Sequence, residues 1–205
     1  MKTLIAVPCM DQVAAPFAHS LACLKRVGEC MISFQMSSLI YDSRNSFCKQ
    51  AISANVDYVL WLDSDMTFPA DTLERMVKHM EDGRDIVTGL YFRRRRPFSP
   101  VLYKELVGGD EPRWTEFDKL PAEGELFEVA GCGMGCCMMR KDILVDVALN
   151  YKTWFTPIEH FGEDLAFSLR ARELGYKMWC DPTIKLGHIG QVIVNETAWL
   201  ASKED

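Results

Sequence analysis

The stretch YVLWLDSDMTF, Tyr58 to Phe68, decides how this chain should fold. It begins as an apolar run that is typical of a fully buried strand, and it ends in two acids, Asp63 and Asp65, with Ser64 between them. Alternate side chains of an extended segment point to the same face, so the two carboxylates converge on one spot. We expect a central strand whose carboxyl end carries a site.

Apolar runs on either side of this stretch alternate between strand-like and helix-like patterns. Strands are expected at residues 3–8, 30–36, 57–62 and 85–92, and helices at 14–27, 44–55 and 69–83. Asp42 or Ser43 is the expected N-cap of the second helix, and Pro69 is expected in the first turn of the third. This alternation predicts an α/β fold with a Rossmann-like, mostly parallel sheet flanked by helices, whose ligands gather at the carboxyl ends of the strands.

The second half of the chain has a less regular pattern. Short strand-like runs flank Gly108, Gly109 and Pro112, which predicts a small β-hairpin inserted over residues 97–126 at one edge of the sheet. Beyond it we expect strands at 126–130 and 177–180, a loop through Pro157, and a helix over 163–174 that Gly175 ends. Because 205 residues suffice for one core but not for two full domains, a single domain over residues 1–205 is expected.

Composition and charge limit the partners. Hydrophobic residues make up 48% and charged residues 25% of the chain, which is ordinary for a globular protein and argues against disorder. A formal net charge of -6 gives no general attraction to nucleic acid, so no specific nucleic-acid binding is expected. One run, Arg93 to Arg96, is strongly basic; it either meets phosphate or an anionic acceptor, or is simply solvated.

The cysteines and the apolar segments bear on the compartment. The eight cysteines lie mostly inside predicted strands and helices and not in a spaced framework, as free thiols do in a reducing compartment. Pro8 and Asp11 interrupt the first apolar run before it can form the core of a secretory signal. No window reaches the roughly 18 uncharged apolar residues of a transmembrane segment, so a soluble, cytoplasmic protein is expected.

Asp63 and Asp65 have two competing interpretations. Such a pair suits a hard divalent cation such as Mg²⁺ or Mn²⁺, which takes one or two carboxylates together with waters and the phosphates of a substrate. Turn and cap chemistry before the following helix explains one of the acids but leaves the second unexplained. We therefore favour a metal and phosphate site.

Two later motifs carry further titratable residues. In HFGEDLAFSLRARELGY, residues 160–176, Glu163 and Asp164 occupy the first turn of a predicted helix, where the helix dipole alone could account for them. In TIKLGHIG, residues 183–190, His188 ends an apolar strand between glycines that allow close backbone approach, although an isolated histidine is more often structural. Neither motif is decisive alone.

Other kinds of site are disfavoured. The glycines of GCGMG, residues 131–135, are spaced as in a dinucleotide loop, but a cysteine follows at position 136 and the run CCMMRKDIL, residues 136–144, reads as strand. Cys132, Cys136 and Cys137 lack a second cysteine pair that would complete a zinc site. The sequence contains no Walker loop and no nucleophile elbow.

In their order along the chain, DSD after the third strand, GED at a late helix and GHIG after the next strand resemble the GT-A glycosyltransferases, especially the family 2-like group. The resemblance covers nearly the whole chain. It implies that Asp63 and Asp65 bind the metal, Mn²⁺ or Mg²⁺, and the donor diphosphate, and that His188 completes the metal site. It also implies that Asp164, with Glu163 beside it, is the base near the acceptor.

The same resemblance assigns further residues to the two halves of the site. Those on the donor side are Pro8, Arg44 of an RN element, and Ser64; those on the acceptor or phosphate side are Arg93, Arg94, Gly133 and Gly135. The nucleotide-sugar half is expected at about residues 1–96, the acceptor half at about 97–190, and a C-terminal tail at 191–205.

The resemblance implies transfer of a sugar from a nucleotide-sugar donor, with a UDP-sugar favoured, to a hydroxyl of a glycan or other carbohydrate-bearing acceptor. Asp164 as base predicts inversion at the anomeric carbon, although a carboxylate at a helix start should be a weak base. Many relatives carry an acidic turn after the second strand, whereas this chain has QMSSLIYDS, residues 35–43, so the base of the nucleotide stays open. A non-catalytic nucleotide-sugar or glycan binding module is the alternative; a sugar nucleotidyltransferase is disfavoured because the N-terminal segment lacks a glycine-rich activation loop.

Overall fold

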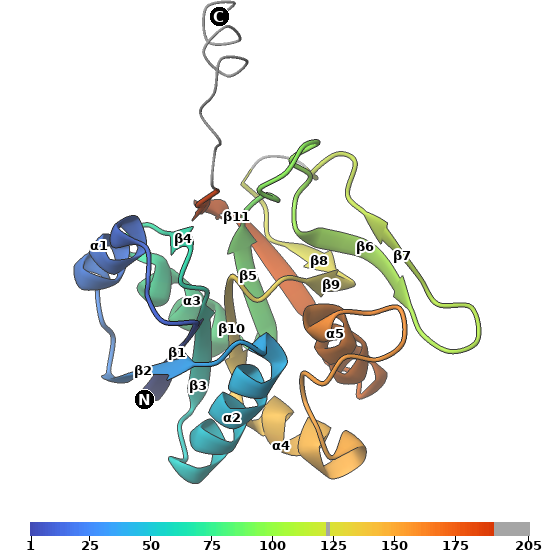
Figure 1. Ribbon diagram of the computed structural model, residues 1–205, viewed down its shortest axis with the longest axis horizontal. Coiled ribbons are helices and arrows are strands. Elements are labelled where there is room, and N and C mark those ends of the chain that lie inside the picture. Colours follow the sequence, from blue (N-terminus) through green and yellow to red (C-terminus); the bar gives the residue numbers. More distant parts are fainter. Residues whose placement is uncertain (122–123, 191–205) are drawn as a thin grey trace, which may run out of the picture.

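A seven-stranded sheet forms the centre of the computed structural model, which describes residues 1–121 and 124–190 (Figure 1). The strand order is β2-β1-β3-β10-β5-β11-β8. These strands are β1 (Lys2–Cys9), β2 (Glu29–Met36), β3 (Tyr58–Leu62), β5 (Ile86–Leu90), β8 (Phe127–Val129), β10 (Cys136–Arg140) and β11 (Met178–Lys185). The tail expected at 191–205 lies outside the described residues.

The strand directions confirm an α/β fold with a mostly parallel sheet. β2, β1, β3, β5 and β11 run one way, while β10 and β8 run against them. β10 lies between β3 and β5 and pairs Cys136 with Leu62. Because β10 starts where β3 ends, the turn at 133–135 reaches the edge of the sheet that carries Asp63, whose backbone N–H donates to the Gly135 carbonyl at 3.0 Å.

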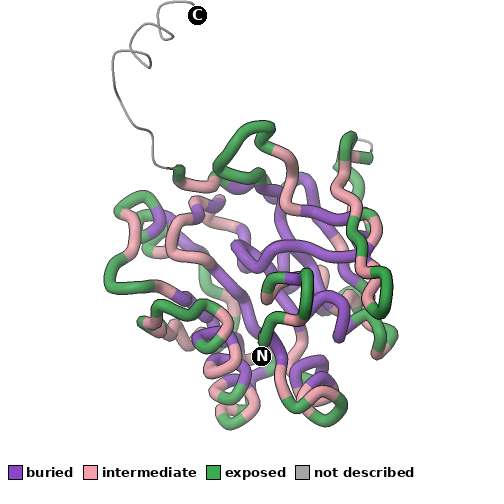
Figure 2. Tube along the Cα trace, turned by 45° about the vertical axis from the view of Figure 1, so that its right-hand side comes forward, coloured by how far each residue is buried: buried purple, intermediate pink, exposed green. Residues whose placement is uncertain are grey.

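Helices cover both faces of the sheet. They are α1 (Ala15–Cys23), α2 (Ile40–Ser53), α3 (Thr72–Glu81), α4 (Lys141–Tyr151) and α5 (Glu163–Glu173). Alternation along the central strands divides the core: Val59 and Trp61 pack with α2, α4 and α5, while Leu60 and Leu62 pack with α1 and α3. Figure 2 shows this buried interior beneath exposed loops. Both faces are buried, as a strand that is apolar at every position requires.

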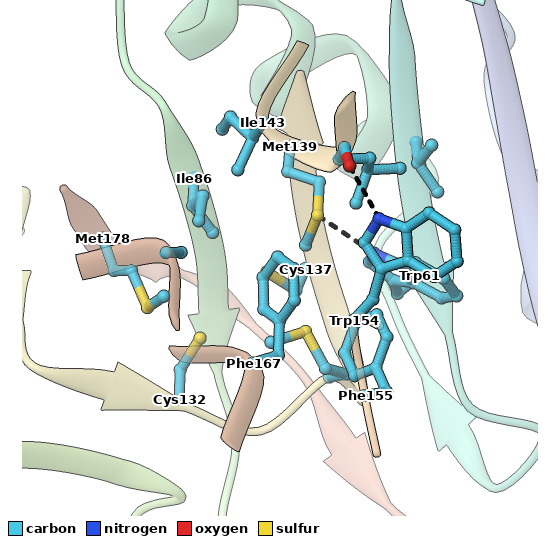
Figure 3. Close-up of a cluster of buried hydrophobic side chains, with 14 of the residues drawn as sticks. Trp61, Ile86, Cys132, Cys137, Met139, Ile143, Trp154, Phe155, Phe167 and Met178 are labelled. Atoms are coloured by element: carbon cyan, nitrogen blue, oxygen red, sulfur yellow. Dashed lines mark hydrogen bonds between the residues drawn. The ribbon is translucent and has the colours of Figure 1, made fainter. Parts of the chain in front are cut away.

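The core around Trp61 fixes the strand that ends in the acids (Figure 3). Trp61 is fully buried and donates from its indole nitrogen to the Met139 sulfur at 3.5 Å. Its ring meets Phe155 edge to face at 5.1 Å, and Phe155 stacks on Phe167 of α5 at 4.5 Å. Aromatic packing of this kind joins the end of β3 to the helix that begins with Glu163 and Asp164.

The inserted hairpin and the two short strands beside the acids complete the sheets. β6 (Leu102–Val107) and β7 (Arg113–Glu116) form the expected hairpin, and β9 (Gly131–Cys132) adds a third strand to it. β4 (Met66–Thr67) pairs with β12 (Gly187–His188). Within the two described ranges, no helix has the length and apolar character to cross a bilayer.

Several predicted boundaries are wrong. Residues 141–151 form helix α4 instead of continuing as strand and loop, because Ile143, Leu144 and Val147 share one buried helical face. α2 begins at Ile40, so the proposed caps at positions 42 and 43 lie inside its first turn, and its N-cap makes no side-chain hydrogen bond. α1 ends at Cys23, β11 continues to Lys185, and α3 begins at Thr72, which leaves Pro69 before the helix.

Candidate functional site

Asp65 and His188 lie side by side at the carboxyl end of β3. The pairing of β12 with β4 places His188 opposite Met66, and the Ile189 backbone N–H donates to the Asp65 carbonyl at 2.8 Å. Gly187 permits this approach, because a Cβ there would collide with the Thr67 hydroxyl. The His188 Nε2 and the Asp65 Oδ2 are 3.7 Å apart.

The orientation of His188 leaves one ring nitrogen available. Nδ1 lies 2.8 Å from the Phe92 carbonyl oxygen, which can only accept, so Nδ1 carries a hydrogen. Nε2 then faces Asp65, and a backbone carbonyl on the far nitrogen is the usual support of a metal-binding histidine. In the absence of a cation, the Asp65 carboxylate beside Nε2 raises the pKa of His188.

The Asp65 carboxylate has a second partner, Arg94. The Arg94 Nη1 lies 2.7 Å from the Asp65 Oδ2. Burial opposes ionisation of Asp65, but His188 and Arg94 together hold its pKa below the ordinary value. Arg94 therefore occupies the oxygen that a cation would use.

Asp65 and His188 fit a divalent cation as a pair. Two atoms that each lie about 2.1 Å from one ion are at most about 4.2 Å apart, and the observed separation of 3.7 Å satisfies this limit. A mixed oxygen and nitrogen set suits Mn²⁺ at least as well as Mg²⁺. Across residues 1–121 and 124–190, no three acids, histidines or cysteines surround a common point, so the remaining ligands would be waters and substrate oxygens.

Asp63 points to a different partner, the buried Arg44 of α2. The Arg44 Nη2 donates to the Asp63 carboxylate at 3.0 and 3.3 Å. The Arg44 side chain is only 1% exposed, and its guanidinium lies 5.7 Å from the Trp61 ring and 5.8 Å from the Phe155 ring. Burial disfavours this charge, but the attraction of nearby carboxylates raises the pKa of Arg44 above its ordinary value.

Glu163 and Asp164 approach the same arginine from the start of α5. The Arg44 Nε is 3.8 Å from the Asp164 Oδ1 and 3.9 Å from the Glu163 Oε1. The Asp164 Oδ1 is buried and makes no hydrogen bond, which disfavours its charged form. Burial raises the pKa of Asp164 to about 8 even though Arg44 opposes the shift. The expectation of a weakened base at the helix start was therefore wrong in direction.

One cavity is lined by Asp65, His188 and Asp164 together. It has a volume of about 580 Å³, and its lining includes Asp63, Asp65, Tyr91, residues 93–96, Tyr103, Asp164 and His188. An adjoining cavity of about 330 Å³ shares Asp63 and Asp65 and is lined also by Pro8, Cys9, Met10, Ser37, Ser38, Ile40 and Ser64. A third cavity, of about 610 Å³, is slightly larger, but none of its lining residues within the described ranges is an acid or a histidine. Chemistry, not size, identifies the site.

The other predicted residues take varied positions. Arg93 lies in the cavity lining and pairs with Glu116 of the hairpin at 2.5 Å. Gly133 and Gly135 are buried behind Tyr91 and are not part of the lining. The sequence analysis did not identify Tyr91 and Tyr103 as lining residues. Tyr91 could have been found, because it directly follows β5 and so lies at the carboxyl edge of the sheet, where ligands bind. All eight cysteines are free thiols, as expected.

The chain resembles solved structures over most of its length. A197 from STIV is 17% identical with a TM-score of 0.62, and the match covers 95% of this chain and 97% of that one. GalNAc-T7, solved with UDP, GalNAc and Mn²⁺, is 9% identical with a TM-score of 0.61; the match covers 95% of this chain but 45% of that one. The chain thus spans less than half of GalNAc-T7, and both likenesses show a shared fold.

Comparison at the level of sequence gives the family. No curated protein matches the chain. The family model described as glycosyl transferase family 2 matches residues 41–147, more than half of the chain, including the RN element and the DSD motif. Together with the α/β architecture of its GT-A neighbours, this match establishes that the chain belongs to glycosyl transferase family 2 and has the GT-A fold.

Proposed function

We propose that this protein transfers a sugar from a nucleotide-sugar donor, with a UDP-sugar favoured, to a hydroxyl of a glycan or other carbohydrate-bearing acceptor. The observation that carries the proposal is the shared cavity: Asp65 and His188 line one part of it and Asp164 another. Such a site can hold the leaving group and a proton acceptor on two sides of one sugar. The UDP, GalNAc and Mn²⁺ with which GalNAc-T7 was solved support the choice of donor and cation.

The donor occupies both cavities in this proposal. The nucleoside lies in the smaller one, which Pro8 and Ser64 help to line, and the diphosphate lies near Asp65, where the two cavities meet. Arg44 holds Asp63 toward the ribose or the sugar. Residues 1–96 thus supply most of the donor half of a single domain, and residues 97–190 supply the acceptor half.

Asp65 and His188 would hold Mn²⁺ or Mg²⁺. When bound, such a cation acts as a Lewis acid that stabilises the negative charge of the departing diphosphate. Arg94 leaves Asp65 when the site fills, and its guanidinium then donates to the diphosphate oxygens, for which its planar fork is suited. Its side chain is half exposed and has room to move.

Asp164 acts on the acceptor. Its carboxylate takes the proton of the acceptor hydroxyl while that oxygen forms a bond to the anomeric carbon. The bond from the anomeric carbon to the phosphate oxygen breaks, and its electron pair leaves with the diphosphate. Attack from the face opposite the leaving group inverts the anomeric centre. Glu163 does not line the cavity, and it supports the site through Arg44.

A thermal-shift panel of nucleotide sugars, with and without Mn²⁺, tests the donor site, because a ligand that binds only the folded state raises its stability. We expect one donor to raise the melting temperature only with Mn²⁺, and Asp65→Ala to abolish that shift. Asp118→Ala is the matched control, because Asp118 is 81% exposed and pairs with Lys104 away from the cavity.

Transfer or donor hydrolysis is then measured with the donor that binds. Binding without either reaction, across a broad set of acceptors, would instead indicate a non-catalytic nucleotide-sugar binding module. No shift with any donor would remove the proposed donor site.

A further inference from the structure

Tyr91 is a buried side chain in the lining of the cavity of about 580 Å³. It follows β5, is 4% exposed, and is one of the lining residues together with Asp63 and Asp164. Its ring meets the His188 ring edge to face at a centroid distance of 5.6 Å. The phenol therefore contacts His188 and lines the same cavity as Asp164.

The GCGMG segment makes room for this phenol. A Cβ at position 133 would collide with the Tyr91 hydroxyl, and one at position 135 would lie 3.1 Å from it. The Gly135 backbone N–H donates to the hydroxyl oxygen at 3.1 Å, and the Gly135 carbonyl accepts from Asp63. The two glycines thus serve to place one hydroxyl beside the acids.

The hydrogen of the Tyr91 hydroxyl has no acceptor among residues 1–121 and 124–190. In that part of the chain the hydroxyl accepts one hydrogen bond, from the Gly135 N–H, and donates none. Burial raises the pKa of Tyr91 well above its ordinary value, and the nearby Asp164 and Asp63 act in the same direction. The hydroxyl keeps its proton at neutral pH, and a buried donor of this kind costs stability unless a partner arrives.

We propose that the Tyr91 hydroxyl donates a hydrogen bond to an oxygen of the sugar being transferred. This inference rests on the proposed function, in which that sugar lies between the diphosphate near Asp65 and the acceptor near Asp164. The contact selects donors that present an oxygen at the correct ring position and orients the anomeric carbon between the two groups.

The first test compares Tyr91→Phe with the wild type and with Tyr103→Phe. Tyr103 lines the same cavity and its hydroxyl also accepts one hydrogen bond, from Arg93 at 3.1 Å, so it is a matched control. With UDP-glucose, UDP-galactose and UDP-GalNAc plus Mn²⁺, we expect Tyr91→Phe to lower kcat/KM about tenfold for the preferred donor, roughly one hydrogen bond. Losses of equal size in both variants, or a change of less than about twofold, would overturn the proposal.

The second test identifies the oxygen. Singly deoxygenated forms of the preferred donor sugar are compared with the parent donor within each enzyme, so the fraction of folded protein cancels. Removal of the oxygen at one ring position should lower kcat/KM of the wild type about tenfold. The same removal should leave kcat/KM of Tyr91→Phe unchanged. Equal costs in both enzymes at every position would reject the contact.

A second variant covers the case in which Tyr91→Phe does not fold, since it removes the acceptor of the Gly135 N–H. Gly133→Ala keeps the tyrosine but displaces its hydroxyl, and should lose the same deoxy discrimination. A wild-type enzyme that turns over no donor would remove the proposed function as well. An active wild type whose discrimination survives in both variants would remove only the role of Tyr91.

Discussion

Arg44 and Asp63 are joined by two hydrogen bonds from one guanidinium nitrogen, at 3.0 and 3.3 Å, in a place where the arginine is 1% exposed. The same guanidinium lies 3.8 Å from Asp164. The buried Arg44 guanidinium therefore lies close both to Asp63, which is assigned to the donor, and to Asp164, which is assigned to the acceptor. This arrangement makes the two halves of the site depend on each other.

Replacing Arg44 should cost more stability than replacing any surface arginine. Arg44→Met leaves Asp63 and Asp164 without their buried cation, and removal of one partner from a buried charge group costs about 3 to 5 kcal/mol. Urea unfolding measures the free energy of unfolding. Arg113→Met, which breaks an ion pair with Glu105 in which Arg113 is 58% exposed, should cost less than about 1 kcal/mol. Similar costs for the two variants would show that Arg44 is not the central cation.

Asp164→Asn should separate binding from transfer. The amide keeps the shape of the side chain but cannot take the acceptor proton, so kcat should fall by about 10² to 10⁴ while the donor dissociation constant stays nearly unchanged. Calorimetry measures donor binding and a coupled assay measures transfer. The neighbouring Glu163→Gln is the control; it should retain much more activity, because Glu163 does not line the cavity. Full transfer by the Asn variant would remove Asp164 as the base.

The pH dependence should follow the raised pKa of Asp164. A base acts only after losing its proton, so a pKa of about 8 moves the rising limb of kcat/KM to higher pH than an ordinary aspartate would give. We expect kcat/KM to climb between pH 6 and pH 8 by roughly tenfold per unit and then to level. Glu163→Gln removes a neighbouring negative charge that helps to raise this pKa, so its rising limb should move to lower pH. A limb with its midpoint near pH 4 would mean that solvent reaches Asp164 freely.

Arg94→Met should have opposite effects on two ligands. Arg94 competes with a cation for the Asp65 Oδ2, so its removal should tighten binding of Mn²⁺ alone, by up to about fivefold for a half-exposed ion pair. UDP in saturating Mn²⁺ should bind about tenfold more weakly, because a charged hydrogen-bond donor to the diphosphate is lost. Titration of the Mn²⁺ paramagnetic signal gives the first quantity and calorimetry the second.

Arg95→Met is the control for Arg94. Arg95 lines the same cavity but makes no hydrogen bond to Asp65, so Mn²⁺ affinity should not change. If both variants changed Mn²⁺ affinity equally, the effect would come from the overall charge of residues 93–96. The specific competition at Asp65 would then be rejected.

The sequence predicted those parts of the fold and site that local pattern controls. The apolar run before Asp63 favoured a strand covered on both faces, which predicted that the acids at its end lie at the carboxyl edge of the sheet. The order of the motifs also brought Asp164 and His188 into consideration, and the structure places both in one cavity with Asp65. Their roles in metal binding and catalysis stay predictions.

Other features depend on contacts that no local pattern encodes. Alternation suggested that Asp63 and Asp65 share one spot, but Arg44 holds the first and Arg94 with His188 the second. The basicity of Asp164 was misjudged because burial, a tertiary property, outweighs the helix dipole. Helix α4 was missed although its apolar spacing was visible, because the preceding CCMMR run read as strand and was extended too far.

The reversed direction of β10 also affects how the substrate range of this chain can change. β5 leaves the sheet at the edge where β10 enters it, so the long excursion between Tyr91 and Gly135, with its hairpin, begins and ends at the same place. Both ends are tied down, by Tyr91 accepting from Gly135 and by Gly135 accepting from Asp63. Within this excursion Arg94 pairs with Asp65 and β8 belongs to the central sheet, so these parts are tied to the site and to the core. We expect the hairpin of β6 and β7 to tolerate changes of length and sequence more readily, while the acids keep their positions.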